Sequence, residues 1–305
     1  MIAPALQRRL EDVLGDRVRF EVPMARHISL GVGGPADALA TPADRDELAA
    51  LLAVLGEEGV PHLFLGKGFN TLVRDEGVEG VVVQLSRLRR IEERPGGRLR
   101  VEVGVSHAQL TRFCVERGLA GLEFGAGIPG TVGGWLAMNA GIGTREMVDV
   151  VREVEVMSPS GRHRRHLVQD TLRFGYRALR GLAPGSALIS TLLEVTPAEP
   201  EQVRAEVERL LARRAATQPL DVPSCGSVFK NPPGDFAGRL IEAAGLKGER
   251  VGGAEISSVH ANFIANRGDA TARDVIELIE LARRRIAEAS GIELETEVQI
   301  VGRTS

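Results

Sequence analysis

The sequence predicts an α+β protein with more than one domain, and three observations lead to this prediction. The chain has 305 residues, which is at the upper edge of what one hydrophobic core usually serves. Hydrophobic residues make up 43% and charged residues 26% of it, as in an ordinary globular protein. Helix and strand signals are mixed along the chain, and some neighbouring strands read as hairpins. This order is typical of an α+β fold.

Charge and cysteine content exclude several classes of function. The net charge of −3 offers no general attraction for polyanions, which argues against a nucleic-acid binder that works through a basic surface. Cys114 and Cys225 cannot make a disulfide framework, and neither has a metal-type Cys or His neighbour. We therefore expect a reducing, cytoplasmic setting and no metal site.

The N-terminal elements have clear patterns. Leu6, Leu10 and Leu14 recur at helical spacing between charges, which indicates an amphipathic surface helix without a signal-peptide block. The longest apolar run, 48–55, is far too short to span a bilayer. Ser106 and Gly118 have the positions of an N-cap and a C-terminal stop. The first half thus predicts helices over 46–58 and 106–118 and strands over 61–65, 81–85 and 99–105.

The second half of the chain continues the mixed order. A hairpin of 151–157 and 163–168 is predicted around SPSG, and we interpret His163 and His166 as a solvated strand face rather than metal ligands. Asp235 and Thr271 are the expected N-caps of two further helices, with stops at Gly245 and Gly291. The remaining elements expected are strands over 187–195, 260–266 and 294–301 and a helix over 199–216.

The stretch EFGAGIPGTVGGWLAMNAGIG, 123–143, contains seven glycines and the only tryptophan, Trp135. Within it, three glycines spell G-x-G-x-x-G, the Rossmann dinucleotide fingerprint. That fingerprint needs an apolar strand directly before it and a helix that begins inside it. The preceding AGLEF makes a poor strand, and Gly133 and Gly134 weaken a helix there. The spelling is therefore weak evidence for a Rossmann site.

A second glycine loop, GKGFN, follows the predicted strand 61–65. Small residues in series let successive backbone N–H groups turn inward and bind an anion. Two such loops in one half of the chain suggest that they hold the two phosphates of one pyrophosphate. The alternative is that both are only tight turns.

Several motifs together resemble a known family, the UDP-N-acetylenolpyruvoylglucosamine reductases, in its shorter, second type. The resemblance covers about residues 22 to 302. It rests on GVGGPAD (31–37), GKGFNTLV (66–73), GAGIPGTVGGWLAMNAG (125–141), FGYR (174–177), PSCGSVFKNP (223–232), AGLKG (244–248), VGGAEISSVHANFIAN (251–266) and LETEV (294–298), in the family's order.

The resemblance implies a fold and a reaction. The fold is the FAD-binding fold of the vanillyl-alcohol-oxidase/p-cresol-methylhydroxylase type, with FAD-binding subdomains at 1–75 and 76–218 and a substrate-binding domain at 219–305. The reaction uses NADPH to reduce the enolpyruvyl ether of UDP-N-acetylglucosamine to UDP-N-acetylmuramate, a cytoplasmic step of peptidoglycan synthesis. Non-covalent FAD is the implied cofactor and NADPH the co-substrate, and the oligomeric state is left open.

Three catalytic residues carry over by resemblance: Arg177 in FGYR, Ser227 in CGSVF and Glu297 in LETEV. A guanidinium suits a carboxylate next to developing negative charge. A second acid there helps only when protonated, so we expect a raised pKa for Glu297. Ser227 is expected to deliver a proton to C2 of the substrate. On pattern alone these residues read as an ordinary arginine, a turn serine and a solvated strand face.

The resemblance also implies binding residues. Those for the nucleotide-sugar are Arg177, Lys230, Asn231, Lys247 and His260, with a structural role for His260 as the alternative. Those for FAD are Gly66, Lys67, Gly68, Phe69, Asn70, Thr71, Gly125, Ala126, Gly127, Ile128, Pro129, Gly130, Thr131, Gly133, Gly134, Asn139, Gly141, Arg213 and Gln218.

Two departures and three rivals stay open at this point. Lys67 and Phe69 stand where the family commonly has small residues, and Trp135 replaces a smaller residue, either under the loop or near the adenine. The rivals are an oxygen-using oxidase of the same fold, a non-catalytic flavin or nucleotide-sugar binding protein, and a Rossmann dehydrogenase. Absence of a histidine from 123–143 weakly disfavours the oxidase, because such enzymes often tether flavin through His or Cys.

Overall fold

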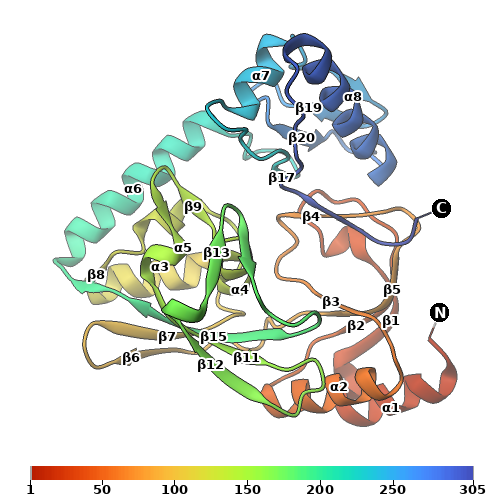
Figure 1. The fold of residues 1–305 in the computed structure, drawn as a ribbon, viewed down its shortest axis with the longest axis vertical. Coiled ribbons are helices and arrows are strands. Elements are labelled where there is room, and N and C mark those ends of the chain that lie inside the picture. Colours follow the sequence, from red (N-terminus) through yellow and green to blue (C-terminus); the bar gives the residue numbers. More distant parts are fainter. Residues whose placement is uncertain (1, 305) are drawn as a thin grey trace. The chain divides into compact units, whose positions relative to one another are not determined.

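The computed structural model describes residues 2–304 (Figure 1). The chain forms two compact units, each made of segments distant in sequence. The first unit comprises Met1–Phe20, Ala38–Gly66 and Gly80–Arg214, and the second comprises Glu21–Asp37, Lys67–Glu79 and Ala215–Ser305. The mixed content of helices and strands confirms the predicted α+β class. None of the helices described is both long and apolar enough to cross a bilayer.

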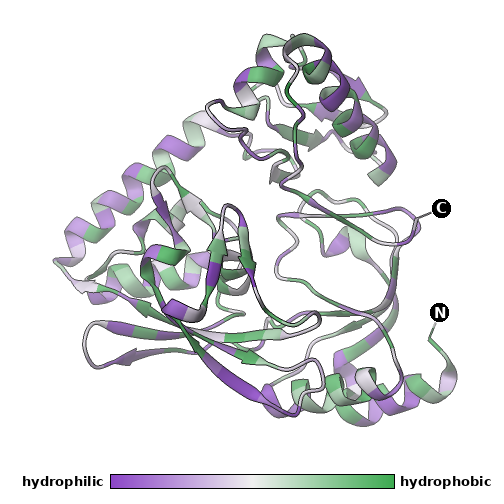
Figure 2. Ribbon diagram, in the orientation of Figure 1, coloured by the Kyte–Doolittle hydropathy of each residue, from purple (hydrophilic) through white to green (hydrophobic). Residues whose placement is uncertain are grey.

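The N-terminal helices pack on a four-stranded sheet. The predicted amphipathic N-terminal helix is α1 (Pro4–Leu14). The side chain of Asp44 caps α2 (Arg45–Glu57) by accepting from the N–H groups of Asp46 and Glu47. Leucines of both helices are buried in one cluster with valines of the sheet. Hydrophobic and hydrophilic residues alternate along both helices in Figure 2. The strand order is β1 (Val18–Pro23), β2 (Pro35–Ala40), β5 (Val78–Val83) and β3 (His62–Phe64).

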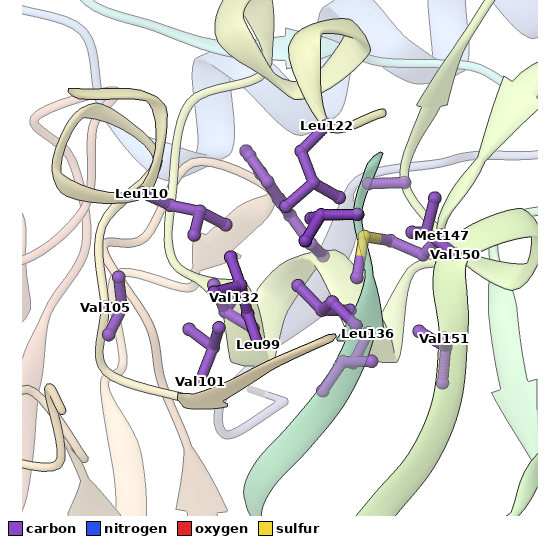
Figure 3. Packing of buried hydrophobic residues seen from close by; sticks show 14 of the residues in the cluster. Leu99, Val101, Val105, Leu110, Leu122, Val132, Leu136, Met147, Val150 and Val151 are labelled. Carbon is purple, nitrogen blue, oxygen red and sulfur yellow. The ribbon is translucent and has the colours of Figure 1, made fainter. Parts of the chain in front are cut away.

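A five-stranded antiparallel sheet organises the rest of the first unit. The predicted hairpin is confirmed as β11 (Val151–Met157) paired with β12 (Arg164–Val168), and His163 and His166 are exposed. The order is β12, β11, β15 (Ala187–Glu194), β7 (Arg98–Glu102) and β6 (Ile91–Arg94). Figure 3 shows buried side chains of the core cluster that includes this sheet, among them Leu99 of the sheet and Leu136 and Met147 of neighbouring helices.

Helices and short hairpins complete this unit. The expected helix start and stop are confirmed, since α3 (His107–Arg117) has a capping box at Ser106 and a left-handed Gly118. Val203 and Val207 of α6 (Pro200–Thr217) pack on Val115. The other elements are α4 (Val132–Ala137), α5 (Met147–Val150), β8 (Leu119–Ala120) paired with β16 (Thr196–Pro197), β9 (Gly141–Ile142) with β10 (Arg145–Glu146), and β13 (Arg173–Gly175) with β14 (Ala178–Arg180).

The second unit contains a smaller antiparallel sheet and two helices. Thr271 is the N-cap of α8 (Ala272–Ser290) and Gly291 ends the helix with a positive φ, both as predicted, and Asp274 completes a capping box with Thr271. The carboxylate of Asp75 accepts from the first two N–H groups of α8 at 2.9 Å each. The sheet order is β17 (Ser224–Ser227), β20 (Phe263–Asn266), β19 (Ala254–Ile256) and β18 (Arg250–Val251); β4 (Thr71–Val73) pairs in parallel with β21 (Gln299–Val301).

Two expectations for this unit are wrong in detail. The N-cap of α7 (Ala237–Ala243) is Phe236 rather than Asp235. The side chain of Asn231 accepts from the N–H of Ala237 at 3.1 Å, and Asp235 instead pairs with Arg239, which lowers the pKa of Asp235 to about 2. The closing strand covers only 299–301 rather than 294–301. Its first part is irregular because it pairs with 228–230 before it reaches β4.

Candidate active site

The glycine-rich stretch of the first unit lacks Rossmann geometry. Residues Glu123–Gly127 form a 3₁₀ helix, preceded only by the two-residue strand β8. Thr131 then caps α4, which has six residues. A dinucleotide fingerprint needs a full strand before the loop and a long helix after it. The G-x-G-x-x-G spelling in this stretch is therefore accidental.

Trp135 packs beneath this stretch. Its side chain is 3% exposed and belongs to the main core cluster of the unit. The indole N–H donates to the carbonyl oxygen of Ile128 at 3.2 Å. A Cβ on Gly125 would lie 2.7 Å from Cζ3 of the indole ring, so only glycine fits there. Trp135 thus explains one of the glycines and holds the loop from below.

Gly66, the first residue of the GKGFN motif, lies beside the second glycine motif within the first unit. A Cβ on Gly66 would lie 2.9 Å from Oγ1 of Thr131. The backbone N–H groups of Gly130 and Thr131 are buried, and neither has an acceptor within residues 2–304. Adjacent buried donors of this kind need an external acceptor, and a phosphate oxygen satisfies them well. This site therefore fits the pyrophosphate of FAD.

Arg214 lies beside the predicted cofactor loop, although the prediction selected its neighbour Arg213 instead. The structure places Arg213 on the exposed side of α6, whereas the side chain of Arg214 lies against the glycine stretch. A Cβ on Gly127 would lie 3.5 Å from Cδ of Arg214, and burial lowers the pKa of this guanidinium. The helical phase of α6 was the only signal in the sequence that separates these neighbours.

The GKGFN loop belongs mainly to the second unit and is tightly held there. Gly68 has φ +66°, and a Cβ on it would lie 2.8 Å from Cα of Ile28. The hydroxyl of Ser29 lies within hydrogen-bond distance of the carbonyl oxygens of Gly68 (3.0 Å) and Ser224 (2.7 Å). Among the described residues, no group accepts from the N–H groups of Gly68 and Phe69. This loop offers backbone donors to an anion despite Lys67 and Phe69, and Lys67 itself is exposed.

The segments that carry Ser227 and Glu297 pair with each other in the second unit. The N–H of Glu297 donates to the carbonyl oxygen of Val228, the residue after Ser227, at 2.8 Å. Phe229 and Thr296 form an isolated antiparallel bridge on the same pair of segments. Cys225, on the same strand as Ser227, is buried, and burial raises the pKa of its thiol to about 12. Cys225 therefore serves packing, and Ser227 stays the candidate proton donor on this strand.

The predicted nucleotide-sugar residues of this unit all lie near its surface. Lys230 pairs with Glu295, and Lys247 pairs with Glu242 at 2.7 Å. Nδ1 of His260 accepts from the N–H of Asn262 at 3.2 Å, so that nitrogen carries no proton. Burial lowers the pKa of His260, and the nearby charge of Lys247 lowers it further.

Arg177 lies on the turn between β13 and β14 of the first unit, with φ +54°. Its Nη1 is 3.7 Å from Oε1 of Glu146, and its guanidinium lies 5.1 Å from the ring centre of Tyr176. The guanidinium is thus held beside an acid at the edge of the unit. Gln218, predicted as an FAD-binding residue, is half-buried just after α6.

Comparison with known proteins identifies the class first. A family model described as an FAD binding domain matches residues 36–166. An alkyldihydroxyacetonephosphate synthase structure shares the fold alone, at 16% identity, with a TM-score of 0.50 over 65% of this chain and 41% of that one. Together with the backbone donors at Gly130 and Thr131, these matches define a protein of the FAD-binding class and confirm the predicted fold class.

The family follows from closer relatives. A model described as the C-terminal domain of UDP-N-acetylenolpyruvoylglucosamine reductase matches residues 218–301. The reductase of that name from Geobacter metallireducens is 47% identical over 97% of this chain and 98% of its own length. The crystal structure of the Thermus caldophilus enzyme (MurB) is 38% identical, with a TM-score of 0.79 over 93% of this chain and 99% of that one. The chain belongs to the UDP-N-acetylenolpyruvoylglucosamine reductase family.

Proposed function

We propose that this chain uses NADPH to reduce the enolpyruvyl ether of UDP-N-acetylglucosamine to UDP-N-acetylmuramate, as a cytoplasmic step of peptidoglycan synthesis. The single observation that carries the proposal beyond family membership is the pairing of segments 227–230 and 295–298. It places a hydroxyl and a carboxyl group on adjacent segments of one unit, which is what a proton transfer assisted by a second acid requires.

Backbone donors hold the cofactor in this proposal. Gly130 and Thr131 of the first unit offer their N–H groups to a phosphate of FAD. When bound, FAD supplies the hydride that reduces the carbon–carbon double bond of the enolpyruvyl group at C3. All the other roles belong to side chains of this chain.

Charge and proton control fall to three residues. Hydride addition at C3 leaves negative charge at C2, and that charge spreads into the neighbouring carboxylate. The guanidinium of Arg177 binds this carboxylate and stabilises the charge, and a protonated Glu297 donates a hydrogen bond to it. The hydroxyl of Ser227 then donates its proton to C2 and regains one from water. Because the serine protonates one face of C2, it also sets the configuration of the product.

The nucleotide end of the substrate is bound by lysines. Lys230 and Lys247 provide ammonium groups for the diphosphate, and each lies beside a glutamate that it exchanges for phosphate oxygens. His260 is uncharged near neutral pH, since its pKa is lowered, and it supports Asn262 rather than adding charge to the diphosphate site.

The test is a direct assay of the purified protein. We expect FAD to be released on denaturation and NADPH to be oxidised under nitrogen only when the enolpyruvyl UDP-sugar is present. Formation of one UDP-N-acetylmuramate per NADPH would complete the result. NADPH oxidation that needs oxygen and leaves the UDP-sugar unchanged would contradict the proposal and favour the oxidase. A protein that cannot be reconstituted with FAD would overturn the cofactor assignment.

A further inference from the structure

Two residues of the first unit have a strained backbone and contact the same carboxylate. Asn139 has φ +40° and Arg177 has φ +54°. They are two of the three residues other than glycine that have a positive φ among those described. Such conformations are unfavourable for residues other than glycine and persist only where their surroundings hold them. The carboxylate shared by Asn139 and Arg177 is that of Glu146.

The amide of Asn139 is engaged within the unit. Its Nδ2 donates to Oε2 of Glu146 at 2.8 Å and to the carbonyl oxygen of Gly175 at 3.2 Å. Its Oδ1 accepts from the N–H of Val148 at 3.0 Å. The side chain is 1% exposed. Both amide hydrogens are thus used by the protein, and Asn139 has no N–H left for a ligand.

Glu146 faces two ways. Its Oε2 accepts from Asn139, and its Oε1 lies 3.7 Å from Nη1 of Arg177. Nη2 of Arg177 lies 3.5 Å from the carbonyl oxygen of Gly141, which is the strand partner of Glu146. A Cβ on Gly141 would lie 2.7 Å from Cγ of Glu146, so a larger residue there would displace the carboxylate. The network thus runs from the buried amide of Asn139 through the carboxylate of Glu146 to the guanidinium of Arg177.

We infer that Glu146 is a positioning residue: held by Asn139, it orients the guanidinium of Arg177 toward the substrate carboxylate. This inference rests on the proposed function for the role of Arg177, but not for the contacts themselves. Glu146 lies 3.7 Å from one nitrogen of the guanidinium, and the five N–H groups of a guanidinium can serve more than one carboxylate. A fixed guanidinium also loses less freedom when the substrate binds.

The inference assigns a function to two residues of the glycine-rich motif. Asn139 acts on the reaction through Glu146, and Gly141 provides the space that Glu146 needs. A misplacement of about 1 Å in a binding group can cost about 10²-fold in rate. We therefore expect Glu146→Ala to lower kcat/KM for the enolpyruvyl UDP-sugar by about 10- to 100-fold, with Glu146→Gln losing less because its amide oxygen still accepts from Asn139.

The kinetic test separates positioning from general damage. In Glu146→Ala, reduction of the flavin by NADPH should stay within about twofold of the unsubstituted rate, whereas its reoxidation by the UDP-sugar should slow. In an Arg177→Ala background, Glu146→Ala should have no further effect, because the group that it orients is gone. Additive losses would overturn the inference. Glu153→Gln, which removes a carboxylate from Arg100 elsewhere in this unit, is the matched control.

A second readout does not depend on turnover. In protein with ¹⁵N- and ¹³C-labelled arginine, the guanidinium of Arg177, assigned with Arg177→Lys, should rotate slowly and should rotate faster in Glu146→Ala. Unchanged rotation would overturn the positioning role even in an active enzyme. An unsubstituted protein that binds FAD but does not consume the UDP-sugar would defeat the proposed function, and the rotation experiment would still decide whether Glu146 holds Arg177.

Discussion

The side-chain amide of Asn70 donates to the main-chain carbonyl oxygen of Glu297 at 3.1 Å, across 227 positions of sequence. The carbonyl oxygen of Asn70 accepts in turn from the N–H of Gln299 at 3.1 Å. Two hydrogen bonds therefore join the loop GKGFN to the segment that carries Glu297. Local changes in the loop should be felt at the acid.

Replacing Asn70 tests this link. Asn70→Ala should lower the free energy of unfolding by about 0.5–1.5 kcal/mol, the net value of one hydrogen bond. Asn70→Asp should cost more, since its carboxylate would face the carbonyl oxygen of Glu297. Urea unfolding followed by circular dichroism measures both, and Lys67→Ala, at an exposed position in the same loop, is the control. Equal stability of Asn70→Ala and the unsubstituted protein would contradict the link.

Gly125 should tolerate no side chain. We expect Gly125→Ala to destabilise by about 1–3 kcal/mol, because its methyl group would overlap the ring of Trp135. The matched control is Gly134→Ala, where the nearest atom to a new Cβ is 4.0 Å away. In a Trp135→Leu background, the added cost of Gly125→Ala should fall. If the two alanine variants melt at the same temperature, the packing argument fails.

Ser227→Ala should divide the reaction in two. Reduction of the flavin by NADPH should proceed unchanged, whereas its reoxidation by the UDP-sugar should slow by about 10²–10⁴-fold, the usual value of a general acid. Stopped-flow absorbance at the flavin band resolves the two phases. Ser224→Ala, three residues earlier on the same strand, should leave both intact. Full turnover by Ser227→Ala would end its assignment as proton donor.

Substitutions of Glu297 test whether it acts as a neutral hydrogen-bond donor. Glu297→Gln retains an N–H donor of nearly the same length, and Glu297→Ala retains none. If the protonated acid stabilises the charged carboxylate of the substrate, the Gln variant should keep at least about tenfold more kcat than the Ala variant. Single-turnover reoxidation rates give the comparison. Equal losses in both variants would show that the negative charge, or a proton, is what matters.

His260 makes stability dependent on pH. Burial lowers its pKa in the folded protein below the ordinary 6.5. The unfolded chain therefore binds a proton first as the pH falls, so stability present above 6.5 declines on acidification toward the folded pKa. His260→Gln keeps an acceptor for Asn262 and should lose less stability between pH 7 and pH 5. His163→Gln, on the exposed hairpin, should follow the unsubstituted protein. Parallel curves for the three proteins would exclude this contribution.

Most secondary structure was predictable because it depends on local chemistry. Ser106 with Gly118 and Thr271 with Gly291 mark helix ends through their own hydrogen bonds and φ angles, and the structure confirms both pairs. Asp235 misled the prediction, because Asn231, six residues before Ala237, takes the donor that an N-cap would take. The closing strand was overextended, since alternation in the sequence does not reveal that 295–298 pairs with 228–230.

In the predicted site, too, local motifs were predictable and contacts between distant residues were not. The motifs named the catalytic candidates by resemblance, but only the helical phase of α6 distinguishes Arg214 from Arg213, and no local pattern reveals the role of Glu146. The side chain of Glu146 gains meaning only from Asn139 and Arg177, which lie 7 and 31 positions away in the sequence. Contacts of this kind are set by packing, which a single sequence without its fold does not display.

By itself, the sequence determined the α+β class, the ends of α3 and α8 and the family, because caps, periodicity and ordered motifs are properties of neighbouring residues. Only the tertiary structure decided that Trp135 is a core residue beneath the loop, that Gly125 exists to make room for it, and that Ser227 and Glu297 lie on paired segments. The physical reason is that burial and hydrogen-bond partners depend on which distant segments contact each other. Each of these three features is such a contact.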